Sequence, residues 1–168
     1  MRDLLFLARR VTRTLSARLG FVPPLLARIV LGVVFVQSGW GKLHDLDRVV
    51  AFFTELGIPA PQIQAPFVAG TELVCGTLVL AGLATRLAAV PLIVTMIVAL
   101  ATAQAENVST LSDLFGTIEC LYAVLLAGLV IGGAGTVSLD AWIARRLDAA
   151  DSLAPQRAHA AARAAARA

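Results

Sequence analysis

The sequence contains few of the residues that usually anchor metals or covalently held cofactors. It has two cysteines and two histidines in 168 residues, and His44 and His159 lie far apart in the chain. No C-x-x-C pair, glycine-rich phosphate loop or Ser/His/Asp arrangement is present. We therefore expect no metal site, and we do not expect a stand-alone enzyme that carries its own cofactor.

Both cysteines fall inside apolar runs, which excludes a disulfide framework outside the membrane. Cys75 and Cys120 are either two small buried apolar residues or a redox-active pair. A pair would need both residues at matching depth. The ends of the apolar runs are not defined closely enough to compare these depths, so both interpretations stay open.

Charged residues are scarce as well. They make up 15% of the chain, against 58% hydrophobic residues, and the mean hydropathy is +0.82. These values lie well above those of soluble proteins and predict an integral membrane protein of one domain. Four apolar runs are each close to the roughly 20 residues that a spanning helix needs. The predicted fold is all-α, a four-transmembrane-helix bundle with spans at about 25–43, 67–83, 87–105 and 114–133.

The fourteen Lys and Arg residues are divided unevenly between the two sides of the predicted membrane. Only Lys42 and Arg48 lie on one side, and Arg28 lies just inside the first span. The positive-inside rule therefore places both termini in the cytoplasm. We expect these basic ends to contact anionic lipid headgroups of the bilayer, and we expect no nucleic-acid partner. The residues on the basic side are Arg2, Arg9, Arg10, Arg13, Arg18, Arg86, Arg145, Arg146, Arg157, Arg163 and Arg167.

Residues 1–22 precede the first span and combine an apolar stripe at helical spacing with arginines off that stripe. This pattern predicts a basic amphipathic helix on the cytoplasmic surface. A mitochondrial transit peptide has the same pattern, and the sequence does not separate the two. We expect Pro23 and Pro24 to break this helix before the first span begins.

A short external interfacial helix is predicted between the first two spans. Asp45 or Asp47 can cap its start, and Gly57 followed by Pro59 ends it. At the other end of the chain, residues 143–168 form an Ala/Arg-rich cytoplasmic tail, to which we assign no chemistry.

Two glutamates, Glu72 and Glu119, lie inside apolar runs. A charged side chain at the centre of a spanning helix costs roughly 2.5–3.5 kcal/mol, so these carboxylates must face protein partners or water. Each is five residues from the start of its predicted span. We therefore expect both at similar depth, roughly 7–8 Å below the outer interface at 1.5 Å per residue. Lys42 is predicted on the same side, with Tyr122 and Cys75 as neighbours.

Glu72, Glu119, Lys42 and Tyr122 form the predicted functional site. Two membrane-embedded carboxyl groups could bind a quinone headgroup and relay its protons. The alternative is that both glutamates only link helices, with partners such as Lys42, Thr71 or Ser38. Arg28 also has two interpretations. Either its side chain extends to the nearby interface, or it pairs with a buried carboxylate.

Several short motifs occur in a specific order along the chain. They are Arg28-Ile-Val-Leu-Gly32, Ser38-Gly39-Trp40-Gly41-Lys42, Phe53-Thr-Glu-Leu-Gly57-Ile-Pro59, Glu72-Leu-Val-Cys-Gly76, Gly82-Leu-Ala-Thr-Arg86 and Gly133-Ala-Gly-Thr-Val-Ser-Leu-Asp140. Together they resemble the DoxX family of small bacterial membrane proteins. The resemblance covers roughly residues 25–142 by motif order and spacing, within a predicted membrane domain of residues 23–142.

This resemblance implies a multi-pass protein of the bacterial inner (plasma) membrane. Family members are associated with oxidoreductase systems, including quinone-linked thiosulfate oxidation and thiol or superoxide defence complexes. The expected function is therefore a membrane subunit beside a redox enzyme, with quinone as the candidate cofactor. The alternative is a non-enzymatic carrier of small solutes or ions, or a membrane assembly factor. Small residues in the first two spans pack either within the bundle or between protomers, which leaves a homo-oligomer open.

Overall fold

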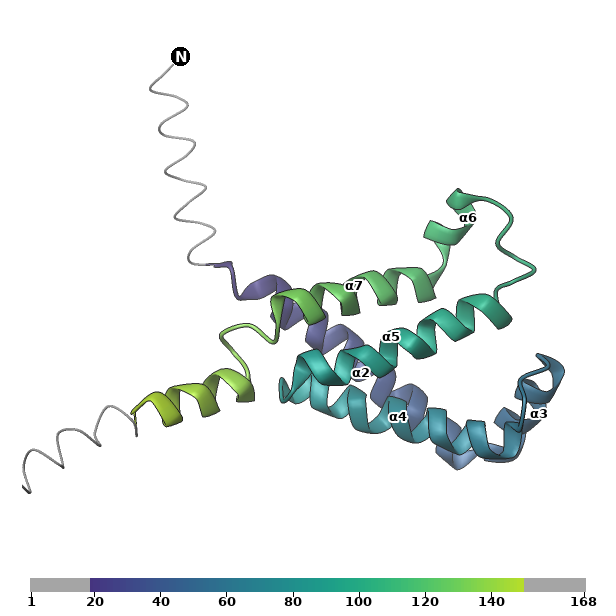
Figure 1. Ribbon diagram of the computed structural model, residues 1–168, viewed down its shortest axis with the longest axis horizontal. Coiled ribbons are helices and arrows are strands. Elements are labelled where there is room, and N and C mark those ends of the chain that lie inside the picture. Colours follow the sequence, from purple (N-terminus) through teal and green to yellow (C-terminus); the bar gives the residue numbers. More distant parts are fainter. Residues whose placement is uncertain (1–18, 150–168) are drawn as a thin grey trace, which may run out of the picture.

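The computed structural model describes residues 19–149, and every regular element in that range is a helix (Figure 1). The predicted N-terminal surface helix and most of the predicted tail lie outside the described residues. Residues 139–149 are also helical. The other helices, in chain order, are α2 (Val22–His44), α3 (Leu46–Glu55), α4 (Pro61–Ala81), α5 (Thr85–Thr102), α6 (Leu111–Gly116) and α7 (Ile118–Gly132).

Among the described residues, three helices are long and apolar enough to cross a membrane: α2, α4 and α5. The fourth apolar run does not form one helix as predicted. Thr117 divides it into α6 and α7, because its backbone is extended and its hydroxyl accepts a hydrogen bond from the Cys120 N–H at 3.3 Å. Helix α7 has 15 residues and is about 22 Å long, against a hydrocarbon core of roughly 30 Å.

Two helices begin earlier than predicted, and proline explains both differences. Helix α2 begins at Val22, so Pro23 and Pro24 lie inside its first turn. Helix α4 begins at Pro61, six residues before the predicted start of the second span. Proline is tolerated in a first turn, where its missing N–H would have no partner within the helix. The predicted short helix between them is present as α3, with Asp45 accepting a hydrogen bond from the Arg48 N–H.

Helices α2 and α4 pack closely because glycines face the partner helix. A Cβ atom at Gly39 would lie 2.5 Å from the Leu73 nitrogen, and one at Gly76 would lie 2.9 Å from the Phe35 Cβ. Small residues in this way let apolar helices approach one another in a membrane. Helix α5 packs beside α7, and α4 beside α5 (Figure 1). The buried core lies between these helices and consists of Leu31, Phe35, Val79, Ala88, Ala89, Leu92, Met96, Leu126 and Leu129.

Arg28 joins three segments at one end of the molecule and is only 3% exposed. Its guanidinium donates hydrogen bonds to the carbonyls of Val79 and Leu80 at the end of α4, at 3.0 and 2.9 Å. It also donates to the carbonyls of Ala134 and Val137 in the segment after α7, at 3.0 and 2.6 Å. Neither sequence interpretation of Arg28 named these hydrogen-bond partners. Its partners are backbone carbonyls rather than solvent or a carboxylate.

Asp140 completes this end of the molecule by fixing the turn between α4 and α5. Its carboxylate accepts hydrogen bonds from the Ala84 and Thr85 N–H groups at 2.8 and 3.4 Å, and its own N–H donates to the Gly82 carbonyl at 3.0 Å. These contacts hold Gly82 (φ 71°) and Ala84 (φ 47°) in the left-handed region, which is unfavourable for alanine. We call this the closed end, and the opposite end, near α3, the open end. Helices α4 and α5 diverge from the closed end towards the open end (Figure 1).

Replacement of Arg28 by lysine should strongly destabilise the protein. Lysine keeps the charge but lacks the planar fork, so it cannot reach all four carbonyls, and buried acceptors lose their donors. We expect Arg28→Lys to lower the free energy of unfolding by about 3 kcal/mol. Denaturant titration in detergent, followed by circular dichroism, measures this change.

Arg86→Lys is the matched control for that experiment. Arg86 lies at the same end but is exposed and makes a single hydrogen bond of 3.3 Å, to the Ile131 carbonyl. Its replacement should change the free energy of unfolding by about 0.5 kcal/mol or less. Equal effects of the two substitutions would show that the four carbonyl bonds of Arg28 are not what stabilises the closed end.

Candidate functional site

Lys42 and Glu72 form an ion pair that links α2 to α4. The Lys42 Nζ donates to both carboxylate oxygens of Glu72, at 2.6 and 2.7 Å. The Glu72 side chain is 3% exposed and that of Lys42 is 29% exposed. Of the three partners considered from sequence, Lys42 is thus the one that binds this carboxylate. It is the sole ion pair among residues 19–149.

The sequence builds this pair through the spacing of residues on α2. Gly39 brings α2 against the backbone of α4 at Ala69 and Leu73. Lys42 follows three residues later, on the same face of α2, so its side chain reaches the carboxylate beside Leu73. A carboxylate in an apolar helix is costly unless a cation lies close to it. The two charges therefore determine each other's position.

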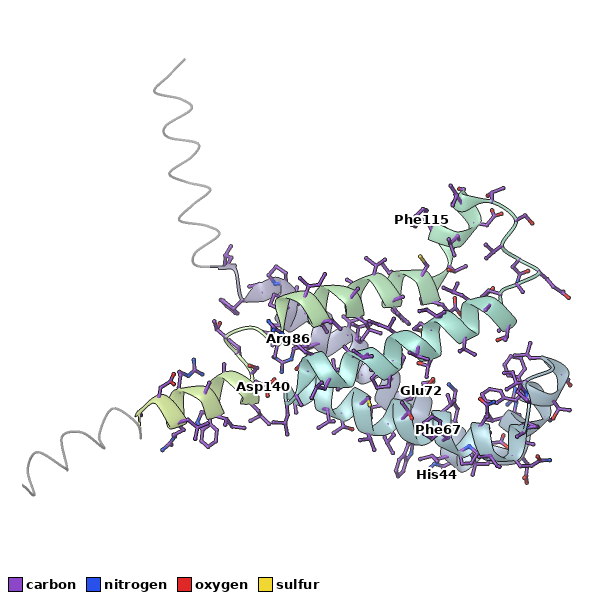
Figure 2. All side chains as sticks on the ribbon, in the orientation of Figure 1. His44, Phe67, Glu72, Arg86, Phe115 and Asp140 are labelled. Carbon is purple, nitrogen blue, oxygen red and sulfur yellow. The ribbon has the colours of Figure 1, made fainter. Side chains whose placement is uncertain are left out.

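The ion pair borders a cavity of about 460 Å³ between α3, α4 and α5. Glu72 lies on the part of α4 that faces this space (Figure 2). Most lining residues are apolar, and α3 contributes Phe52, Phe53 and Leu56. The polar residues in the lining are Lys42, Gln64, Thr71, Glu72, Thr95 and Thr102. A largely apolar cavity with a few convergent polar groups is the usual form of a small-molecule site.

The cavity offers both a donor and an acceptor at one point. A lysine ammonium has three N–H donors. Within the described residues, the hydrogen bonds of the Lys42 ammonium go to Glu72 alone. The Glu72 oxygens retain further acceptor capacity, because each can accept more than one hydrogen bond. A ligand that carries a carbonyl and a hydroxyl group, or that interconverts them, would be complementary to this pair.

Glu119 lies elsewhere and does not join this pair. It is the second residue of α7, and its Oε1 accepts a hydrogen bond from Gln104 at 3.2 Å. Its Oε2 is buried and has no hydrogen-bond partner among the described residues. The prediction of equal depth assumed helices that begin at 67 and 114, whereas α4 begins at Pro61 and α7 at Ile118. Equal depth itself stays a prediction. Glu72 is eleven residues along α4, whereas Glu119 is in the first turn of α7.

Tyr122 and Cys75 also lie outside the cavity lining. Both pack against the buried core, and the Tyr122 ring centroid is 6.1 Å from that of Phe35. Cys75 and Cys120 are free thiols. In residues 19–149, no group of three or more His, Cys, Asp or Glu side chains is placed to hold a metal ion. The predicted site therefore separates into the Lys42–Glu72 cavity and the isolated Glu119.

Sequence reasoning missed the cavity itself. The signal available for it was the apolar face of α3, which includes Phe53 and Leu56, together with Thr95 and Thr102 on one face of α5. Each pattern was visible alone, but only the fold shows that α3 and α5 face the same space as Glu72.

Removal of either member of the ion pair should destabilise the protein, and removal of both should cost less than the sum. We expect Lys42→Met to lower the free energy of unfolding by about 3 kcal/mol, because Glu72 is left buried without its cation. Glu72→Gln should cost about 1–2 kcal/mol, since Lys42 is partly exposed. A double-mutant cycle in detergent measures the coupling, with Arg48→Met on α3 as an exposed control. Strictly additive effects would contradict a coupled pair.

Comparison with known proteins places this architecture among membrane proteins. The chain is 31% identical to the "Putative oxidoreductase CatD" of Bacillus subtilis over 121 residues, which are 71% of this chain and 85% of that protein. It is 44% identical to the "Uncharacterized membrane protein Rv3486" of Mycobacterium tuberculosis over 71 residues, 42% of this chain and 44% of that protein. No solved structure matches the chain.

The family model described as DoxX matches residues 24–105. This range includes α2 except its first two residues, all of α3, α4 and α5, every residue of the 460 Å³ cavity lining, and both members of the ion pair. The resemblance inferred from the motifs is confirmed. With the Bacillus relative matched over most of its length, it follows that this chain is a membrane protein of the DoxX family.

Proposed function

We propose that this chain is the membrane subunit of an oxidoreductase system and that its Lys42–Glu72 cavity binds a quinone headgroup. One observation carries this proposal: a buried, bidentate ion pair borders a largely apolar cavity of about 460 Å³. A quinone has carbonyl oxygens that accept hydrogen bonds, and a quinol has hydroxyl groups that donate them. Lys42 and Glu72 supply the complementary donor and acceptor.

The family supports a redox setting for this site. The name of the Bacillus relative describes it as a putative oxidoreductase. The sequence has two histidines and two cysteines, and both cysteines are free thiols. These are few residues with which to hold a redox centre of its own. We therefore propose that electrons come from a partner protein that docks on this subunit, and that this chain holds the quinone and its protons. Self-association into a homo-oligomer is compatible with that role.

The proposed topology places the closed end in the cytoplasm and α3 on the outer side of a bacterial inner membrane. The basic residues Arg86, Arg145 and Arg146 lie at the closed end, as the positive-inside rule requires. In this arrangement α7 is the fourth span. Its 15 residues are short, and α6 with the preceding loop extends its path towards the outer interface. Residues 1–22 and 143–168 would then lie on the cytoplasmic surface.

Protons would reach the site through carboxyl groups. Glu72 is in contact with the cavity, whereas Glu119 lies near the outer end of α5 with one buried oxygen that has no partner in the described chain. A carboxyl group of that kind can hold a proton without leaving a charge unmatched. We assign Glu72 to the quinone and Glu119 to proton exchange nearer the outer surface. Tyr122, whose ring packs on Phe35, supports the helix that carries Glu119.

A second candidate function is that of an assembly factor, or a carrier of small solutes or ions, without redox chemistry. It is favoured by the observation that Lys42 already satisfies both oxygens of Glu72, so the pair can act as an interhelical link alone. The two candidates differ in what the cavity binds.

Quinone binding should depend on the Glu72 carboxylate. In nanodiscs, we expect a short-chain quinone to bind the wild-type protein, and Glu72→Gln to weaken binding roughly 10- to 100-fold through loss of a charge-assisted hydrogen bond. Quenching of intrinsic tryptophan fluorescence by the quinone provides the measurement. Glu55→Gln is the matched control, because Glu55 is an exposed carboxylate at the end of α3.

Equal affinity of the quinone for the wild-type protein and for Glu72→Gln would contradict the quinone proposal. In the assembled complex, the double variant Glu72→Gln with Glu119→Gln should also lose quinone-dependent turnover. Solute uptake into proteoliposomes that persists without any quinone binding would favour the carrier function instead.

A further inference from the structure

We propose that the ligand of the Lys42–Glu72 cavity reaches it from the lipid phase, through a lateral opening between α4 and α5. The ligand class is then a membrane-dissolved molecule with a polar head and a linear apolar tail, rather than a compact water-soluble one. This inference rests on the proposed function and specifies the substrate of the same site. It follows from the shape of the cavity, from the helix at its open end and from the residues at its side.

The cavity is elongated along α5. Its lining includes Val90, Val94, Val98 and Thr102, which are spaced by four residues and therefore lie on one face of the helix. From Val90 to Thr102 the helix rises about 18 Å. The cavity of about 460 Å³ therefore borders α5 over that length, and we call this elongated space the channel. An extended chain attached to a small head fits this shape better than a compact molecule does.

Helix α3 lies at the open end (Figure 1) and forms part of the wall of the channel there. Three of its apolar side chains, Phe52, Phe53 and Leu56, belong to the cavity lining. In the proposed topology this is the side that faces water. Apolar side chains at this end disfavour the entry of a polar solute from water.

The side of the channel is formed by apolar residues that keep large exposed surfaces. Phe67 on α4 is 72% exposed, and Val94 and Val98 on α5 are 53% and 44% exposed. All three line the cavity and belong to helices that are long and apolar enough to cross a membrane. Apolar side chains exposed on such helices contact lipid. The cavity therefore meets the acyl chains of the bilayer along the α4–α5 seam.

The polar groups lie where a head entering by this route would stop. Glu72 and Thr71 on α4, and Thr95 on α5, all line the cavity, and the buried Glu72 holds the Lys42 ammonium there. A head that binds them leaves its tail between Phe67 and Val94. The tail keeps apolar contacts throughout, so binding needs no exposure of apolar surface to water.

A bulky side chain at Val94 should block the tail without touching the ion pair. In nanodiscs, we compare a quinone that has no tail with the same ring carrying a decyl chain, at matched mole fractions in the bilayer. We expect Val94→Trp to weaken binding of the decyl quinone at least about tenfold and to leave the tailless ring within about twofold. Ile97→Trp is the matched control. Ile97 is on the same helix and 55% exposed, but it does not line the cavity.

Two results separate this inference from the proposed function. If both quinones bind in a Glu72-dependent manner and Val94→Trp weakens neither, or weakens both equally, the lateral channel is wrong and the quinone site stands. If neither quinone binds the wild-type protein, the proposed function is wrong, and the access route is then decided by a measurement that needs no ligand.

That measurement is thiol labelling of Thr71→Cys, in a variant with Cys75→Ala and Cys120→Ala, in membrane vesicles with the outer side exposed. A lipid-soluble thiol reagent should modify the new cysteine several-fold faster than a charged, impermeant reagent. Glu55→Cys on α3 is the control and should react with both. Modification of Thr71→Cys by the impermeant reagent at the rate of Glu55→Cys would overturn the lateral route.

Discussion

The hydrogen bonds of one buried guanidinium set the geometry of this membrane protein. Arg28 lies within an apolar helix, where an unmatched charge is costly, and the acceptors it finds are backbone carbonyls of the α4 terminus and of the segment after α7. The end of a helix carries carbonyls without intrahelical donors and a partial negative charge, so it is a favourable place for a cation. The fork of arginine spans two carbonyls of α4 and two of the later segment. Three parts of the chain that are distant in sequence are thereby held at one point.

This fixed point explains why the cavity lies at the opposite end. Asp140 caps the start of α5 and holds the α4–α5 turn, so these two helices are in contact at the closed end and diverge away from it. Helices α2 and α4 cannot diverge in the same way, because glycines bring them together along their length and Lys42 binds Glu72 near the open end. The seam between α4 and α5 is therefore where space remains. Helix α3, which follows α2 directly, lines part of that space.

The sequence predicts the parts of this structure that depend on composition and charge, and it misses those that depend on backbone geometry. Apolar runs identify the helices, and the cost of an isolated charge in lipid makes Lys42 a natural partner for Glu72. The acceptors of Arg28 were not predictable, because carbonyls are present at every residue and leave no signature in the side chains. The start of the helix that carries Glu119 was missed for a related reason. In the sequence, Thr117 is a small residue within an apolar run. In the structure, its hydroxyl accepts a hydrogen bond from the Cys120 N–H and caps the start of a new helix.

The Lys42–Glu72 pair can be a structural link and a ligand site at the same time. A pair that served only to join α2 and α4 would be most stable with both charged groups enclosed by the two helices. Donors and acceptors that face lipid without a partner would add an energetic cost. Here Glu72 is enclosed, but Lys42 is 29% exposed and borders a cavity that α2 and α4 do not need for their packing. The glutamate thus fixes the lysine in place, and the lysine presents a donor to the cavity. In such a candidate site, the Lys42–Glu72 contact contributes both to protein stability and to ligand binding. Loss of the Glu72 carboxylate, which orients the Lys42 ammonium, would therefore affect both properties.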